Sequence, residues 1–534
     1  MSILIFLLIS YLLLCFALTK VFTKAGVASS KAWIPGVNFV EWCKIIGRPG
    51  WWAALLLIPL VNIFIFAGMA VDMVRSFGKY SFWDSALAVI YAPISFFLIG
   101  KNEEDKYLGP TLEAESAYAQ KMVDAQESGN TRELKKLEHN NPYKKSAGRE
   151  WAESIIFAVF AAAFIRMFLI EAYVIPTPSM EGSLLVGDFL FVSKAHYGIR
   201  MPMTIAQFPL LHNTIPFLGT ESYLKSPSLD YKRLPAITNV KLNDPIVFNY
   251  PEGDSVYVTP GRTVSVHDIR RNPGFYGSVP NGRSLKVRPI DKRDHYIKRC
   301  VALPGDKIEI KDKQVYINGK PTENPENLQY RYSIRVSNDP SGNLVKNLFE
   351  KLDNWGVNLG DIKRNKQQNS GIFNLTQKQL EQVQSFNEQV VVEPAQIKAD
   401  PYGLFPHDPT NFPNWSLNDF GPVTIPKAGE SVVITPNNIA LYKRVITTYE
   451  GNELAIKSGR IYINDEVVTN YTFKQDYYWA MGDNRHNSED SRYWGFVPQN
   501  HMVGKPLFIW FSTKNGSMFE GINWSRIFSS ARKM

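Results

Sequence analysis

The sequence predicts a mainly β extramembrane domain of antiparallel sheets, with an inserted mixed subdomain, preceded by four α-helical membrane spans. Three observations predict it. The overall hydrophobic content of 45% is ordinary for a soluble protein, but apolar residues concentrate in the first third of the 534 residues. After Asp188, short runs of β-branched and aromatic residues alternate with Gly, Pro, Asn and Asp. From 321 to 427 the composition shifts to Asn, Gln and Pro, which indicates an insertion.

Four apolar segments approach the roughly 20 residues that a membrane helix needs. They are Ile3–Leu18, Trp51–Ala70, Phe82–Gly100 and Trp151–Val174. The first has neither a basic n-region nor a small-residue cleavage site, so we expect an anchor rather than a removable signal peptide.

Arg166 lies within the last apolar segment. A charge at the centre of a bilayer is costly, so we expect this residue near the outer end of the span. There it can pair with Glu171. The pattern does not indicate a catalytic role for Arg166.

Lys and Arg collect in two loops, at 21–50 and 101–150. Because basic loops stay in the cytoplasm, the chain after Val174 is predicted to lie outside it. The predicted location is the plasma (inner) membrane, with several spans and an extracytoplasmic β domain. The net charge of +9 is mild and forms no basic stripe interleaved with aromatic residues, so nucleic acid is not an expected partner.

The predicted domain order places a membrane region before a divided β domain. The predicted parts are 1–100 with three spans, a cytoplasmic linker at 101–150, a final span at 151–174, the first β part at 175–320, the inserted subdomain at 321–427, the second β part at 428–515 and a tail at 516–534.

Nine short runs read as strands, and two helices are predicted inside the insertion. The strand-like runs are FLFVSK, DPIVFNY, DSVYVT, KIEI, QVYING, SVVIT, ALYKRVITT, RIYIND and PLFIWFS. The first helix has Leu344, Leu348 and Leu352 at positions i, i+4 and i+8, and the second begins with a capping box from Thr376 to Gln379.

The chain has only three cysteines, Cys15, Cys43 and Cys300. No two of them fall in one predicted extramembrane domain, and none has metal-ligand spacing. The sequence therefore predicts no disulfide and no structural zinc.

Two segments on either side of the insertion resemble each other. Ile297–Gly319 and Tyr442–Asp465 each contain a Lys-Arg pair, a Gly turn, an Ile-Lys pair and a Tyr-Ile-Asn run. This similarity has two explanations. The segments arose by duplication, or they are two independent β-hairpins whose shared geometry requires similar residues. Lys298 and Lys443 are thus both candidates for a single chemical role.

Ser179 stands in a Pro-rich turn directly after the last apolar segment. Such a serine is usually only a turn residue, and a serine nucleophile needs a base near its hydroxyl. None of the eight histidines has a triad context; His295 and His486 are flanked by polar residues typical of a surface. The alternative base is a buried lysine with a lowered pKa, and Lys298 has apolar neighbours, although a strand lysine is more often exposed.

Four blocks, PTPSM…GDFLFV, DPIVF, YIKRCVALPGDKI and AMGDNRHNSEDSRYWGFVP, occur in this order along the chain. In this order and spacing they resemble the type I signal peptidases (leader peptidases), membrane-bound Ser-Lys serine proteases. The last block is the most specific, since its Gly-Asp-Asn-Arg run and the Ser, Asp and Arg after it keep a fixed spacing.

The resemblance implies a role for particular residues. Ser179 would be the nucleophile and Lys298 the general base, and the Ser179 N–H and the hydroxyl of Thr177 would form the oxyanion hole. Thr177 stands where a serine is common. Cys300 and Ala302 also differ from the usual residues around the Lys-Arg pair.

Further residues of these blocks would support the site. Ser488 would help to orient the Lys298 amine, and Asp490 and Arg492 would form an ion pair that holds the loop. Met180, together with the apolar run after it, would help to bind the substrate.

The implied function is a membrane-bound endopeptidase that cleaves N-terminal signal peptides from exported preproteins without a cofactor. Its partners would be preproteins and the lipid bilayer. Two alternatives stay open: a non-catalytic membrane-anchored β-fold binding protein, and a Ser-Lys protease for one dedicated partner.

Overall fold

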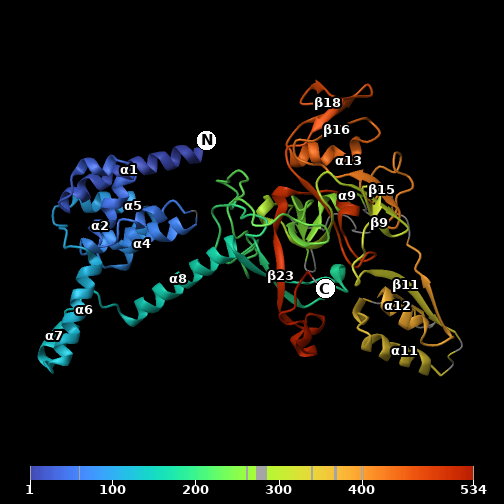
Figure 1. Cartoon of the computed structure of the whole chain (residues 1–534), viewed down its shortest axis with the longest axis horizontal. Coiled ribbons are helices and arrows are strands. Elements are labelled where there is room, and N and C mark those ends of the chain that lie inside the picture. Colours follow the sequence, from blue (N-terminus) through green and yellow to red (C-terminus); the bar gives the residue numbers. More distant parts are fainter. Residues whose placement is uncertain are drawn as a thin grey trace. The chain divides into compact units, whose positions relative to one another are not determined.

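The chain forms two compact units, Met1–Phe157 and Ala158–Met534, of which the first is helical and the second mainly β (Figure 1). The structure is a computed structural model that describes residues 2–58, 60–259, 263–271, 285–337, 339, 341–361, 363–365, 370–397, 400 and 402–532.

The first unit consists of helices joined by short turns. Its elements are α1 (Ser2–Lys24), the 3-10 helix η1 (Ser29–Trp33), α2 (Val37–Ile45), α3 (Trp52–Leu55), α4 (Val61–Ser76), α5 (Phe82–Lys101), α6 (Thr111–Glu127), α7 (Thr131–His139) and the start of α8 (Ala147–Phe168).

The two halves of α1 have different surroundings. Leu18, Val21 and Phe22 in its second half are buried in a core shared with α2, α4 and α5. The first half exposes large apolar side chains such as Leu7 and Leu8. Figure 1 shows these first turns extending away from the other helices of the unit.

Three described helices are long and apolar enough to cross a membrane, judged by length and composition. They are Ile5–Lys24, Phe82–Lys101 and Ala147–Phe168. The predicted span Trp51–Ala70 is not one helix, because it divides into α3 and α4. Leu60 lies at the break with φ of 71°, a conformation that helix interiors exclude. The prediction of four spans is therefore not confirmed.

The helix α5 is bent sharply at its middle. Tyr91 leaves the helical conformation (φ −156°, ψ 84°), and Pro93 follows two residues later. The segments that flank α5 meet: the Nζ of Lys79, which precedes the helix, lies 2.7 Å from the carboxylate of Asp105, which follows it. Lys24 also binds the carbonyls of Ile99 and Asp105. Since a straight helix of this length would separate its ends by about 30 Å, α5 folds back at Tyr91.

The last apolar helix, α8, ends at Phe168, six residues before the predicted end of the span. Residues Ile170–Val174 form strand β1 instead, because they pair with β2 (Asp188–Ser193). The predicted ion pair is confirmed, with Arg166 Nε 2.6 Å from Glu171. Burial alone would raise the pKa of Glu171, but Lys194 and Arg166 lower it well below its usual range.

The second unit is built on a seven-stranded sheet whose described strand pairs are all antiparallel, as the sequence predicts. In spatial order the strands are β1, β2, β23 (Met502–Ser512), β3 (Pro245–Asn249), β7 (His295–Ala302), β21 (Tyr477–Met481) and β22 (Val497–Pro498).

The second unit also contains smaller antiparallel sheets. They are β10 (Lys320–Pro321), β9 (Gln314–Ile317), β8 (Lys307–Lys311) and β15 (Phe420–Thr424); β16 (Ser431–Val433) and β20 (Asn470–Thr472); β17 (Leu454–Lys457), β18 (Arg460–Ile463) and β19 (Glu466–Val467); and β5 (Thr263–Ser265), β4 (Ser255–Val258) and β6 (Lys286–Val287).

The predicted insertion, 321–427, contributes to two different sheets. Its first part has its own sheet of β12 (Lys363–Asn365), β13 (Ser370–Thr376), β11 (Gln329–Val336) and β14 (Val390–Pro394), with its own core under α11 (Asn343–Asn354) and α12 (Gln377–Gln384) (Figure 1). Both predicted helices are confirmed, including the Thr376–Gln379 capping box. Its last part, β15, pairs with β8.

The internal similarity holds for the hairpins but not for the Lys-Arg pairs. Hairpin β8–β9 and hairpin β17–β18 both close at matching turns. However, ALYKRVITT is not a strand: it forms the helix α13 (Ile439–Arg444) and a π-helical turn, Val445–Tyr449. Its apolar residues, such as Leu441 and Ile446, enter the same core as β8 and β21 from this helix.

Candidate active site

Ser179 stands in a short 3-10 turn, Pro178–Met180, between the edge strand β1 and its neighbour β2. Ile175 closes this loop by exchanging backbone hydrogen bonds with Gly187 and Asp188. Ser179 itself is half-buried. The loop therefore carries the hydroxyl on a turn that the sheet fixes at both ends.

Lys298 lies on β7, inside the seven-stranded sheet, and pairs with Ile246 of β3. Its Nζ is 2.7 Å from Ser179 Oγ and 2.9 Å from the carbonyl oxygen of Ile297. In the part of the chain that the structure describes, the hydrogen bonds of the Ser179 hydroxyl join it to Lys298 and Thr177, and no histidine is among its partners.

The surroundings of Lys298 favour its neutral form. The residue is 3% exposed, and burial lowers the pKa of its amine to about 8. The carboxylates of Asp490, Glu489 and Asp483 oppose this effect in part. A lysine in this state can accept a proton near neutral pH.

The loop after β21 carries the predicted ion pair. Asp490 and Arg492 are both buried, and Arg492 donates from Nε (2.9 Å) and Nη2 (2.8 Å) to the carboxylate. Burial raises the pKa of Asp490, but the Arg492 guanidinium outweighs this and lowers it. The Gly482 N–H also donates to Asp490, at 3.1 Å, so the pair holds both ends of the loop together.

Position 482 requires a glycine because neighbouring atoms lie very close to its Cα, and not because its backbone angles exclude other residues. A Cβ at this position would lie 2.2 Å from Ser488 Oγ and 2.4 Å from the carbonyl oxygen of Ser179. No heavy atom is tolerated at such distances. The Ser179 turn therefore packs directly against the backbone of Gly482.

Asn484 connects the same loop to the serine turn. Its backbone N–H donates to the Ser179 carbonyl at 3.2 Å, and its Nδ2 donates to the Pro178 carbonyl at 3.2 Å. In the sequence, Asn484 belongs to the Gly-Asp-Asn-Arg motif, but no role was predicted for it. Its side chain and backbone fix the turn that carries Ser179.

A second buried ion pair lies next to Lys298. Arg299 donates from Nε (2.8 Å) and Nη2 (2.6 Å) to Asp483, and it also contacts the Asn243 carbonyl and Ser183. Strand alternation points the Lys298 and Arg299 side chains to opposite faces of β7. The sequence alone indicated no role for this pair, although its partners stand in the two most informative blocks.

The sheet of the predicted insertion contacts the active-site loop. The N–H of Gln329, at the start of β11, donates to the Asp483 carbonyl, and the Arg485 N–H donates to the Gln329 carbonyl, both at 2.9 Å. The Arg331 N–H donates to Nδ1 of His486 at 3.1 Å. His486 is thus buried, not on the surface as predicted, and burial lowers its pKa to about 3.

The other predicted site residues differ in their burial. Thr177 Oγ1 lies 3.5 Å from Ser179 Oγ and is exposed. Ser488 is buried near Gly482, and its hydroxyl has no hydrogen-bond partner among the described residues. Met180 is only 1% exposed and packs into a core with Ile175 and Leu184, so it offers no surface to a substrate. Such burial depends on the fold and has no signal in the local sequence.

The second lysine of the repeated pattern lies elsewhere. Lys443 is exposed on α13, while its neighbour Arg444 bonds to Asp254 at 2.9 Å. The three cysteines are buried free thiols. Over the described ranges, no cluster of three or more His, Cys, Asp or Glu side chains is suited to hold a metal ion.

Two family models match this chain. One is described as signal peptidase, peptidase S26, and covers residues 148–394 and 469–511, which is more than half of the chain. The other is a family of unknown function (DUF5684) and covers residues 30–110. The first match runs through the sheet of β11 to β14 and resumes shortly before β21.

Curated relatives carry the name Signal peptidase I. One from Buchnera aphidicola (subsp. Acyrthosiphon pisum) is 24% identical, over 70% of this chain and 80% of its own length. One from Haemophilus influenzae is 24% identical over 71% of this chain and 75% of its own. One from Pseudomonas aeruginosa is 24% identical over 71% and 78%. With a family match over more than half its length, this chain belongs to the type I signal peptidases, the serine hydrolases of peptidase family S26.

Proposed function

We propose that this chain is a membrane-bound endopeptidase that cleaves N-terminal signal peptides from exported preproteins with a Ser179–Lys298 dyad. One observation carries the proposal: the buried Lys298 amine lies 2.7 Å from the Ser179 hydroxyl, and burial lowers its pKa to about 8. The pairing matches what a serine nucleophile requires of its base.

In the first step, Ser179 Oγ attacks the carbonyl carbon of the scissile bond while its proton passes to Lys298 Nζ. A tetrahedral oxyanion forms, the C–N bond then breaks, and the departing amine takes the proton from the Lys298 ammonium. The products are an acyl-enzyme that holds the signal peptide and the free N-terminus of the mature protein.

In the second step, water attacks the ester carbonyl and gives a proton to the neutral Lys298. The second tetrahedral intermediate collapses, the ester C–O bond breaks, and Ser179 Oγ recovers a proton from Lys298. The signal peptide leaves with a new carboxyl group, which loses its remaining proton to the solvent, and the enzyme returns to its first state. No redox change or cofactor is involved.

The oxyanion in both steps needs preorganised donors, and loss of one donor typically costs about 100- to 1,000-fold in rate. We assign this role to the Ser179 N–H and the Thr177 hydroxyl. The position of Thr177 Oγ1, 3.5 Å from Ser179 Oγ, supports its assignment. We assign Ser488, Asp490 and Arg492 to the support of the dyad.

We also propose that the second unit lies on the extracytoplasmic side of the plasma membrane. The basic residues of the first unit and of the 101–150 segment support a cytoplasmic position for these loops. Protease added to intact spheroplasts is expected to digest the β unit. Digestion only after lysis would contradict this orientation.

The direct test uses the detergent-solubilised full chain and a purified preprotein. The expected result is a shortened product whose N-terminal sequence begins after the signal peptide, absent when Ser179→Ala protein is used. Binding of the preprotein without cleavage would favour the non-catalytic alternative. Cleavage of only one among several unrelated preproteins would favour a protease for a dedicated partner.

A further inference from the structure

The first unit has a charged end and an apolar end. At the charged end, Arg48 pairs with Asp72 at 2.6 Å, while Lys24 and Lys79 both bind Asp105. The Tyr107 hydroxyl donates to the Ile45 carbonyl in the same region. These contacts bring the ends of α1, α2, α4 and α5 together.

The apolar end contains the turns where the chain reverses direction. One turn joins α3 to α4, a second is the Tyr91 bend of α5, and a third precedes α2 at Gly36. Leu57, Ile63 and Ile90 are large apolar residues exposed in this part of the unit.

Much of the described backbone of the α3–α4 turn is hydrogen-bonded internally. The N–H groups of Leu56, Leu57 and Ile58 donate to the carbonyls of Ala53, Ala54 and Leu55, and that of Asn62 donates to Ile58. A non-helical turn can enter hydrocarbon only when its polar groups are satisfied or shielded.

The depth of the unit matches half a bilayer. Each half of α5, Phe82–Ile90 and Ala92–Lys101, is about 13–15 Å long at 1.5 Å per residue. A hydrocarbon core is about 30 Å thick. Neither half can cross the core, but each can reach its middle.

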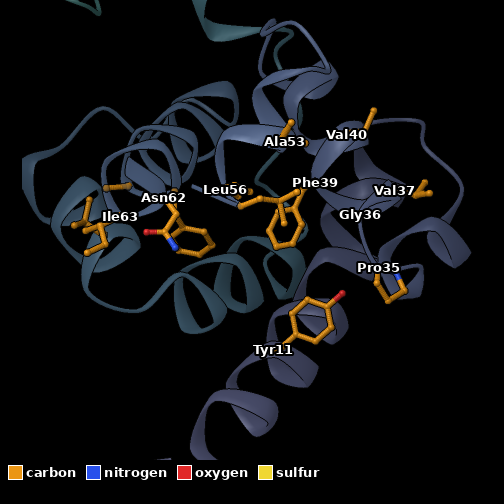
Figure 2. A pocket seen from close by; sticks show the side chains of 15 residues that line it. Tyr11, Pro35, Gly36, Val37, Phe39, Val40, Ala53, Leu56, Asn62 and Ile63 are labelled. Carbon is orange, nitrogen blue, oxygen red and sulfur yellow. The ribbon is translucent and has the colours of Figure 1, made fainter. Parts of the chain in front are cut away.

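A cavity lies among the reversing turns. Its volume is about 1110 Å³, and its walls come from α1, α2, α3, α4 and the first half of α5. Figure 2 shows the ring of Phe39 between Tyr11 and Ala53, with Asn62 and Ile63 at another side. Among the described residues that line it, Tyr11 and Asn62 alone carry polar side-chain groups, and the Tyr11 hydroxyl already accepts from Asn38 at 3.1 Å.

Tyr11 fixes the depth of the cavity. It lies 13 residues before Lys24 on one helix, hence about 20 Å from the charged end. The space is open at the surface of the unit, and its apolar walls favour contact with hydrocarbon over contact with water. The wall has no charged residue that could bind the basic n-region of a signal peptide. A flexible hydrocarbon chain suits it best.

We propose that residues 30–110 form a re-entrant unit that enters only one leaflet, from the cytoplasmic face, and that its cavity holds the acyl chain of a membrane lipid. The basic residues at the charged end support the cytoplasmic face. The inference does not depend on the peptidase mechanism.

Cysteine labelling tests the re-entrant geometry in the full chain. In vesicles of both orientations, Ser81→Cys and Asn102→Cys are expected to react with a membrane-impermeant maleimide from the same, cytoplasmic, face. Ile90→Cys is expected to react only after detergent is added. The parent protein, whose three cysteines are buried, gives the background. Labelling of residues 81 and 102 from opposite faces would mean that α5 crosses the bilayer, and would overturn the proposal.

Photocrosslinking tests the occupant. Full-length Ser179→Ala protein is reconstituted with phosphatidylethanolamine that carries a diazirine in its acyl chain. Crosslinks are expected in peptides that line the cavity, and Ala67→Trp, which places a bulky ring in the cavity wall, is expected to lose a large part of those near residue 67. Ala119→Trp, exposed on α6, is the matched control and is expected to retain them.

Uniform labelling of all exposed apolar surfaces, unchanged by Ala67→Trp, would overturn the acyl-chain assignment. So would crosslinking of the cavity to a photoreactive signal peptide or to a second copy of the chain in preference to lipid. Because the Ser179→Ala protein is inactive under the proposed mechanism, none of these results depends on peptidase activity.

Discussion

The two Lys-Arg pairs of the internal similarity, Lys298-Arg299 and Lys443-Arg444, differ in secondary structure and in burial. Lys298 is buried in β7 beside Ser179, whereas Lys443 is exposed on α13. Arg299 and its partner Asp483 expose 4% and 0% of their side chains, while Arg444 and Asp254 expose 19% and 25%. A lysine in such a short motif can therefore act as a base only when the fold buries its amine and places a hydroxyl beside it.

The largest effect should come from the dyad itself. Lys298→Ala, like Ser179→Ala, is expected to lower kcat on the order of 10⁶-fold, since residues that act as one catalytic unit fail together. Preprotein cleavage followed by gel assay measures the loss. Substantial activity of Lys298→Ala together with an inactive Lys443→Ala would transfer the role to the second pair.

Gly482→Ala sharpens the comparison, because no equivalent glycine accompanies Lys443. The added methyl would displace the Ser179 turn, from which it would be 2.4 Å away. A displacement of about 1 Å can cost on the order of 100-fold in rate. We expect such a loss in kcat together with a destabilisation of about 1–3 kcal/mol from overpacking; normal kcat would contradict the close packing.

The pH profile distinguishes a buried base from an exposed one. Burial lowers the pKa of Lys298 to about 8, and the base must be neutral to act. Activity should therefore fall about tenfold per pH unit below that pKa and level off above it. A profile that still rises near pH 10.4, where an unperturbed lysine titrates, would exclude a buried lysine as the base.

The two arginines should differ in their contribution to stability. Asp483→Ala leaves the buried Arg299 without its partner and is expected to lower the free energy of unfolding by about 3–5 kcal/mol. Asp254→Ala should cost less, because water reaches Arg444. Thermal unfolding of the detergent-solubilised variants measures both, and equal losses would show that burial does not separate the pairs.

Lys443→Ala should have the smallest effect. An exposed side chain without a special role usually changes stability by no more than about 0.5 kcal/mol. The variant is expected to cleave preprotein at the parent rate. A loss of activity here would mean that the exposed lysine contacts the substrate.

Local signals predicted the features that depend on neighbouring residues. The Thr376–Gln379 capping box needs only four residues, and the helix with Leu348 and Leu352 needs only its own period. Lys298 could be selected because the Pro-Gly-Asp turn and the other three blocks accompany it. The first two patterns are short in sequence and do not depend on the rest of the fold, and the four blocks can be recognised by their residues and order alone.

Other features depend on distant contacts and escaped prediction. A hydropathy profile shows how apolar a segment is but not where its helix bends. It therefore did not reveal the bend at Tyr91, although Pro93 was a usable signal. The residues of β1 suit helix and strand equally, and pairing with β2 decides between them. The burial of Met180 and the Arg299–Asp483 pair result from strands that are far apart in the sequence.

The fold-back at Tyr91 has a consequence for how such a chain can change over evolution. A segment that enters and leaves the membrane by the same face adds no net crossing, so it can be gained, lost or exchanged without inverting the domains on its C-terminal side. Residues 30–110 match a family model of their own, which fits a segment that can be exchanged independently of the rest of the chain. The side on which the serine faces its substrate would be decided by α1 and α8 alone.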